Sequence, residues 1–275
     1  MWSKLILAAV LALFVAGALH FAPRRERELL GAQPAAGVPL RLLTWNVGYA
    51  ELEDDTRAHT KDLPAVAETI LRREPDAVAL QELTGAAQLN ALLALLRGRY
   101  RGAVAQQGAG DRFEAVLVRD AGARFAPVAA GERYALGATF RPRADTPEVL
   151  LLSAHADAFN AARRRAYTEA LVGWAEARAQ SAAVFIAGDF NFELRAGDET
   201  NLYTDNLQHD SESYSYLLRS FRDLGRAAGD TAINDRRIDY VFGAADRVRL
   251  RRAEVLRGAA VGRMDHWPLL VEVEF

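Results

Sequence analysis

Short apolar segments that run directly into polar residues constrain this chain more than any other feature of its sequence. The segments are residues 41–45, 77–81, 113–118, 149–153, 183–187, 238–242 and 269–274. Most of them are too apolar to leave one face in water, so they predict β-strands with both faces covered. We therefore expect these strands to be central in their sheets.

The longer segments between the strands have a helical period. Apolar residues fall on one face in residues 61–74, and residues 88–97 and 161–179 show the same spacing. We expect these helices to cover the sheet faces. No internal repeat interrupts the alternation, so residues 40–275 are predicted to form one domain of the α/β class. The polar residues 197–210 are predicted to form a surface loop, the kind of segment that often lies beside a functional site.

Polar residues at the ends of these strands form the candidate site. They are Asn46, Glu82, His155, Asp189 with Asn191, Asp239, and Asp265 with His266. Strands that end at one edge of a sheet project such residues into a common crevice. The sequence therefore predicts that these side chains converge.

Each of these residues alone has an ordinary structural explanation. Asn46 and the pair Asp189 and Asn191 are typical of turns, because their side chains bond the local backbone. A lone histidine such as His155 is more often structural than catalytic. Asp239 is harder to explain in this way, because a carboxylate in a buried strand needs a partner. Only in combination do these residues indicate a functional site.

Composition excludes several functional classes. The 34 basic and 36 acidic residues give a formal net charge of −2, so no basic excess indicates avid binding to duplex nucleic acid. The chain has no cysteine, which excludes thiol catalysis, cysteine-ligated zinc and disulfide bonds.

The N-terminal residues have a different character. Residues 5–22 are apolar apart from His20, and this length is close to the lower limit for a membrane-spanning helix. Small residues at Ala16 and Ala18 also match a signal-peptidase site. We expect residues 1–22 to be a signal peptide or a signal anchor, with a retained anchor slightly favoured, and residues 23–39 to be a linker. The protein is then exported or membrane-anchored.

The polar motifs, in this order, resemble the endonuclease/exonuclease/phosphatase superfamily, the DNase I-like metal-dependent phosphoesterases. They are Leu-Thr-Trp-Asn46, Leu-Gln-Glu82, Ser-Ala-His155, Gly-Asp189-Phe-Asn191, Arg-Ile-Asp239-Tyr and Met-Asp265-His266-Trp-Pro. The resemblance covers residues 40–275. It implies an α/β (α+β) fold, a four-layered sandwich of two packed mixed β-sheets flanked by helices, with a metal-binding cleft at one edge.

The resemblance also implies a role for each residue. Glu82 resembles the main metal ligand, and Asn46 and Asp265 resemble groups close to the metal. Asp189 and Asn191 resemble the pair that positions water and phosphate. His266 resembles the acid/base or phosphate-polarising histidine, with Asp239 as its orienting carboxylate. His155 resembles a second donor to the phosphate.

The chemistry of these residues agrees with those roles. Hydrolysis of a phosphate ester requires charge neutralisation on the phosphate oxygens, an activated water and a stabilised leaving oxygen. Hard oxygen ligands favour Mg²⁺ or Mn²⁺ over zinc, and Mg²⁺ needs only one or two carboxylates. Glu82 and Asp265 would supply these carboxylates.

We therefore expect a divalent-metal-dependent phosphoesterase. Its substrate would be a lipid head group, a small phosphodiester or a nucleic acid, and no protein partner is predicted. A DNase-like endonuclease or exonuclease is the nearest alternative. A catalytically silent binding module with the same fold is an alternative of a different class, disfavoured because such a module has no need of all these polar residues.

Overall fold

The computed structural model describes residues 39–48, 62–108, 112–194, 204–244, 246–262 and 264–275. The predicted N-terminal segment and all of the predicted linker except residue 39 lie outside these ranges, so both stay predictions. Within the described ranges, no helix is long and apolar enough to cross a membrane.

The first of two six-stranded sheets contains both ends of the domain. Its strand order is β11-β12-β1-β2-β4-β3. The strands are β1 (Leu40–Asn46), β2 (Ala77–Leu83), β3 (Arg101–Gln106), β4 (Phe113–Val118), β11 (Arg249–Val255) and β12 (Leu269–Glu274). Only β1 and β2 pair in parallel among the paired strands of this sheet; the other pairs are antiparallel.

The second sheet is built in the same way from the middle of the chain. Its strand order is β5-β6-β7-β8-β10-β9. The strands are β5 (Arg124–Ala130), β6 (Arg133–Phe140), β7 (Val149–His155), β8 (Ala183–Asp189), β9 (Phe221–Asp223) and β10 (Asp239–Ala244). Here β7 and β8 are the parallel pair.

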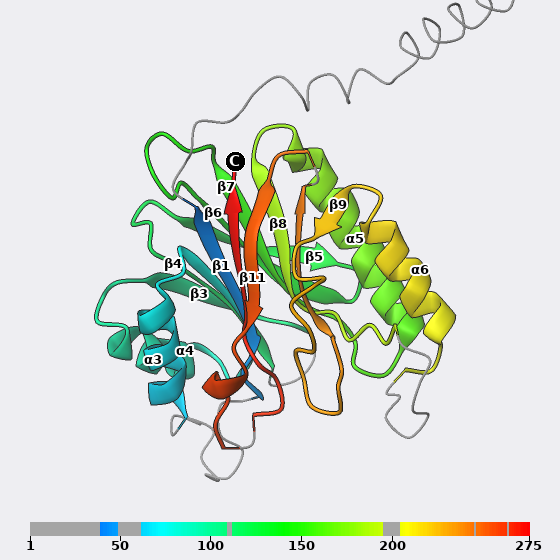
Figure 1. Ribbon diagram of the computed structural model, residues 1–275, viewed down its shortest axis with the longest axis horizontal. Helices are drawn as coiled ribbons and strands as arrows, with labels where there is room; N and C mark the ends of the chain where they lie inside the picture. Colours follow the sequence, from blue (N-terminus) through cyan, green and yellow to red (C-terminus); the bar gives the residue numbers. More distant parts are fainter. Residues whose placement is uncertain (1–38, 49–61, 109–111, 195–203, 245, 263) are drawn as a thin grey trace, which may run out of the picture. The chain divides into compact units, whose positions relative to one another are not determined.

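Helices cover the outer face of each sheet, as Figure 1 shows. They are α3 (Leu63–Arg73), α4 (Ala86–Leu95), α5 (Ala161–Ala179) and α6 (Leu207–Leu217). The short 3₁₀ helix η3 (Arg257–Ala259) contacts α3. One apolar core lies between the sheets, a second packs the first sheet on α3 and α4, and a third packs the second sheet on α5 and α6. This is the four-layered sandwich of two mixed sheets that the family resemblance implies.

The sequence ranges correspond to β1, β2, β4, β7, β8, β10 and β12 and to α3, α4 and α5, with ends displaced by a few residues. The strands that it misses are β3, β5, β6, β9 and β11. Residues of β3, β5 and β11 are largely exposed or half-buried, so these strands lack the continuous apolar run on which the prediction depends.

The prediction of a surface loop at residues 197–210 is wrong over its last part. Residues 197–203 lie outside the described ranges, but α6 begins at Leu207 and contains Asp210. Asp210 is fully buried, and its Oδ1 accepts a hydrogen bond from Nε of the equally buried Arg164 at 2.7 Å. The segment is thus part of a packed helix, and its buried charge is paired with an arginine on α5.

The close approach of β7 and β8 requires glycine at position 188. Its φ is +148°, and a Cβ there would lie 1.8 Å from the carbonyl oxygen of Ala154. The next residues along the two strands, His155 and Asp189, form the neighbouring register pair. Gly188 therefore sets the separation of two candidate site residues.

We predict that Gly188→Ala lowers the free energy of unfolding by at least about 3 kcal/mol, from overlap combined with a strained φ. Urea unfolding followed by circular dichroism measures this. Gly173→Ala in α5 is the matched control, because a Cβ there meets nothing within 4 Å, and alanine stabilises a helix by about 0.5–1 kcal/mol relative to glycine. An equal effect of the two substitutions would contradict the strand-contact explanation.

Candidate active site

Strand direction explains why the polar residues meet. The carboxyl ends of the parallel strands β1, β2, β7 and β8 carry Asn46, Glu82, His155 and Asp189. β10 runs antiparallel to β8 and β12 antiparallel to β1. The beginning of β10, with Asp239, and the residues just before β12 therefore come to the same edge of the sandwich.

Asn46 connects the two sheets at this edge. Its Nδ2 donates to Oε1 of Glu82 at 3.2 Å and to Oδ2 of Asp189 at 3.0 Å. Its Oδ1 accepts from the backbone N–H of Gly48 at 2.9 Å. In this geometry Asn46 is a bridge that positions two carboxylates.

A backbone irregularity presents Glu82. The pairing of β2 with β4 shifts register between Leu80 and Leu83, and Glu82 has a φ of +61°. Such bulges re-aim a side chain at the end of a strand. Arg112 contacts the carboxylate, with its Nη1 3.1 Å from Oε1 of Glu82.

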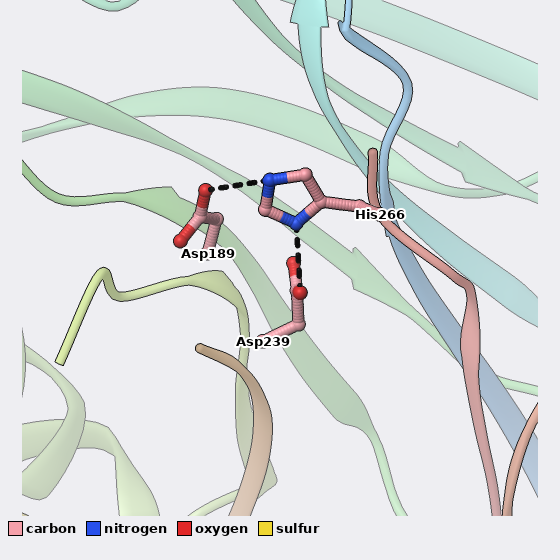
Figure 2. A group of neighbouring side chains, drawn as sticks. All are labelled: Asp189, Asp239 and His266. Atoms are coloured by element: carbon pink, nitrogen blue, oxygen red, sulfur yellow. Dashed lines mark hydrogen bonds and ion pairs between the residues drawn. The ribbon is translucent and has the colours of Figure 1, made fainter. Parts of the chain in front are cut away.

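Asp189 is the centre of the site. Its Oδ2 lies 3.6 Å from Nε2 of His155 and 3.8 Å from Nε2 of His266, and its Oδ1 accepts from the backbone N–H of Asn191 at 2.9 Å. Figure 2 shows His266 between Asp189 and Asp239. Burial raises the pKa of Asp189, against the opposing charge of His266.

His266 is held by a buried carboxylate. Its Nδ1 lies 2.9 Å from Oδ2 of Asp239, whose side chain is fully buried (Figure 2). Burial alone would lower the pKa of His266, but the carboxylates of Asp239, Asp189 and Asp265 outweigh it and raise the pKa to about 10. The imidazole is therefore protonated at neutral pH.

His155 has the opposite protonation state. Burial, with the nearby Arg133, Arg112 and His266, lowers the pKa of His155 to about 4, although Asp189 opposes this. Two histidines in one site thus differ in charge at neutral pH, an arrangement that separates their chemical roles.

Glu114 is a site residue that the sequence reasoning missed. Its Oε1 lies 3.8 Å from Nδ1 of His155, and its Oε2 accepts from Oγ of Ser153 at 2.9 Å. Burial is the main cause that raises the pKa of Glu114 well above its usual range. The available signal was the one used for Asp239, a carboxylate inside an apolar strand, here β4.

Two predicted residues lie at the margin of this cluster. The Asp265 side chain is 54% exposed, and its Oδ1 is 3.9 Å from Nε2 of His266. The Asn191 side chain donates from Nδ2 to the carbonyl oxygen of Ala156 at 3.4 Å, which anchors it to the segment after β7. The structure thus brings all the predicted residues to one edge.

The donor set fits a hard divalent cation. Glu82, Asp189, Asp239, Asp265 and Glu114 concentrate carboxylate oxygens at this edge, and the chain has no cysteine. Ligand atoms of Asp189, Asp239 and His266 also lie within 4.8 Å of one another. That trio already contains the protonated His266 ring, which cannot ligate a metal while it holds its proton.

We predict that in the metal-free protein the His266 ring titrates near pH 10 and that Asp239→Asn moves this titration down towards the ordinary value of about 6.5. Ring ¹⁵N chemical shifts recorded against pH measure it. Because the pKa is raised in the folded state, the stabilisation is complete below about pH 6.5 and is lost as the pH rises to about 10. If the His266 ring titrated in the same pH range in the wild type and in Asp239→Asn, the role of Asp239 in raising this pKa would be contradicted.

Comparison with known proteins identifies the family. The model of the endonuclease/exonuclease/phosphatase family matches residues 43–262, which is most of the chain. The chain belongs to this family. Membership indicates a hydrolase of the phosphoesterase or nuclease kind, and members generally depend on a divalent metal. Asp265 and His266 follow the matched range, and their contacts join them to the site.

Solved structures of the family share the fold. The endonuclease/exonuclease/phosphatase from Bacteroides vulgatus has a TM-score of 0.67 at 17% identity, covering 87% of this chain and 100% of that one. The catalytic domain of human Nocturnin with bound sulfate has a TM-score of 0.64 at 17% identity, covering 86% and 93%. TDP2 from Caenorhabditis elegans has a TM-score of 0.64 at 20% identity, covering 94% and 82%. No curated protein matches the chain in sequence.

Proposed function

We propose that this protein is a divalent-metal-dependent phosphoesterase that hydrolyses a phosphate ester by attack of water. The observation that carries the proposal is the arrangement around Asp189. Asn46 donates hydrogen bonds to both Glu82 and Asp189. Nε2 of His155, which is neutral, and Nε2 of His266, which is charged, each lie less than 4 Å from Asp189.

The charge of each residue supports a particular role. His266 carries a proton at neutral pH and can stabilise or protonate the leaving oxygen, while Asp239 fixes its ring. Asp189, held by Asn46 and Asn191, can accept a hydrogen bond from the attacking water. Neutral His155 can donate from Nε2 to a phosphate oxygen. A Mg²⁺ or Mn²⁺ ion held by Glu82, with Asp265 and Asn46 nearby, would neutralise charge on the phosphate oxygens.

The experiment is an assay of the purified full-length chain with Mg²⁺ or with EDTA. Its substrates are plasmid DNA, sphingomyelin and bis(p-nitrophenyl) phosphate. We expect turnover of at least one with Mg²⁺ and none with EDTA. Cleavage of plasmid DNA alone would select the nuclease alternative. A folded protein that turns over none of the three would contradict the proposal and favour the silent binding module.

We further propose that residues 1–22 export the domain or anchor it to a membrane. The support is the apolar run with its flanking Lys4 and Arg24. Fractionation of cells producing the tagged chain, with the size of the product, would separate retention from cleavage. Recovery of uncleaved protein in the cytosol would contradict this proposal.

A further inference from the structure

A cavity of about 800 Å³ adjoins the candidate site next to His155. It is bordered by residues following β3, by the turn between β5 and β6, by the segment after β7 and by the first turns of α5. Arg112 and His155 line it and also contact Glu82. A group attached to a phosphate in the site would therefore extend into this cavity, whose volume suits a small organic group.

Part of the cavity lining is apolar. Its lining includes Ala130, Ala156, Ala158, Ala162 and Ala166 together with Phe159. Phe159 is 69% exposed, an unusual position for a phenyl ring. The Asp157 carboxylate accepts from the backbone N–H groups of Phe159 and Asn160 at 3.0 and 2.9 Å, so the segment carrying the ring is held in place.

The lining also contains charged side chains. Arg112, Arg133 and Arg163 line it, with Asp157 and Glu132 as the lining carboxylates. Arg133 donates to Asp157 at 2.9 Å, whereas Arg163 is 3.8 Å from both Asp157 and Glu132 and its side chain is 66% exposed. Long, exposed ion pairs are weak. Arg163 is thus available to an anionic group of a ligand.

This lining discriminates between ligand classes. An acyl chain would take water from the guanidinium groups and give them no hydrogen-bond acceptor. A polyanionic sugar would meet the carboxylates of Asp157 and Glu132. A planar ring carrying one further phosphate can use both kinds of lining residue, because aromatic and guanidinium surfaces stack on bases and a guanidinium pairs with phosphate.

We propose that the cavity binds one nucleotide unit of the substrate, with the base against Phe159 and the alanines and a further phosphate at Arg163. This rests on the proposed function, since it assigns the group attached to the scissile phosphate. The substrate class is then a nucleotide-containing phosphodiester.

Calorimetric titration of the full-length protein tests binding directly. We expect thymidine 3′,5′-bisphosphate to bind more tightly than phosphocholine or methyl phosphate. Phe159→Ala should weaken this binding by roughly 5- to 150-fold, the range for loss of one stacked base. Arg163→Gln should weaken the bisphosphate but leave thymidine 5′-monophosphate unchanged. Arg219→Gln, an exposed arginine of the α6 end, is the matched control and should change neither.

A kinetic comparison separates this inference from the proposed function. Methyl p-nitrophenyl phosphate and thymidine 5′-(p-nitrophenyl phosphate) share a leaving group. We expect a higher kcat/KM for the thymidine ester, and we expect Phe159→Ala to remove this difference. Hydrolysis of both esters at equal kcat/KM would overturn the nucleotide assignment alone. Hydrolysis of neither, with tight bisphosphate binding retained, would contradict the proposed function alone. Tightest binding of phosphocholine would overturn the inference in favour of a lipid head group.

Discussion

Replacement of His266 by alanine is expected to lower kcat on a phosphodiester by roughly 100- to 10,000-fold, the usual contribution of a positioned acid or base. The physical reason is the 2.9 Å contact with buried Asp239, which keeps the ring protonated beside Asp189. Steady-state kinetics with Mg²⁺ measure the loss. His209→Ala in α6 is the matched control and should keep wild-type kcat.

The substitution also leaves Asp239 buried without its partner, so the variant must be shown to be folded. Circular dichroism and the urea midpoint provide that check. A folded His266→Ala protein with wild-type kcat would refute the catalytic assignment of this residue.

Replacement of Glu82 by glutamine is expected to have the second large effect. It removes the charge of the residue on which the cation proposal depends while keeping its size and its contact with Asn46. We expect the Mg²⁺ concentration for half-maximal rate to rise by at least about 100-fold, since even the outer partners of metal ligands contribute 10- to 100-fold. Activity measured against Mg²⁺ concentration gives this value.

Glu68→Gln provides the control for Glu82→Gln, because Glu68 is an exposed carboxylate on α3. Its Mg²⁺ dependence should match the wild type. If Glu82→Gln and Glu68→Gln respond to Mg²⁺ alike, the cation is held elsewhere, and Asp189 and Asp239 become the residues to test.

The sequence predicted the central strands well because their signal is local. A strand such as β8, Ala183–Asp189, is buried along its whole length, so its apolar run is visible without knowledge of the fold. β11, with its exposed arginines, and β6, with small residues around Gly137, carry no comparable run. Their strand conformation depends on pairing with β12 and with β5 and β7.

The candidate site was predictable in its residues but not in its contacts. The polar residues at strand ends could be read from the chain, whereas the meeting of Asn46 and Asp189, 143 positions apart, depends on how two sheets pack. The opposite pKa shifts of His155 and His266 depend on burial and on individual carboxylates. Glu114 carries the same local signal as Asp239, a carboxylate in an apolar strand, but the groups that it meets, Ser153 and His155, are on the other sheet.

The most direct test of the central claim, attack of water on a phosphate ester at this site, is isotope incorporation. Bis(p-nitrophenyl) phosphate is hydrolysed by the full-length chain with Mg²⁺ in H₂¹⁸O, and the products are analysed by mass spectrometry. We predict one ¹⁸O atom in p-nitrophenyl phosphate, none in p-nitrophenol, and, in the same time, at least about 100-fold less product with His266→Ala. Label in p-nitrophenol, or labelled phosphate formed equally by His266→Ala, would contradict it.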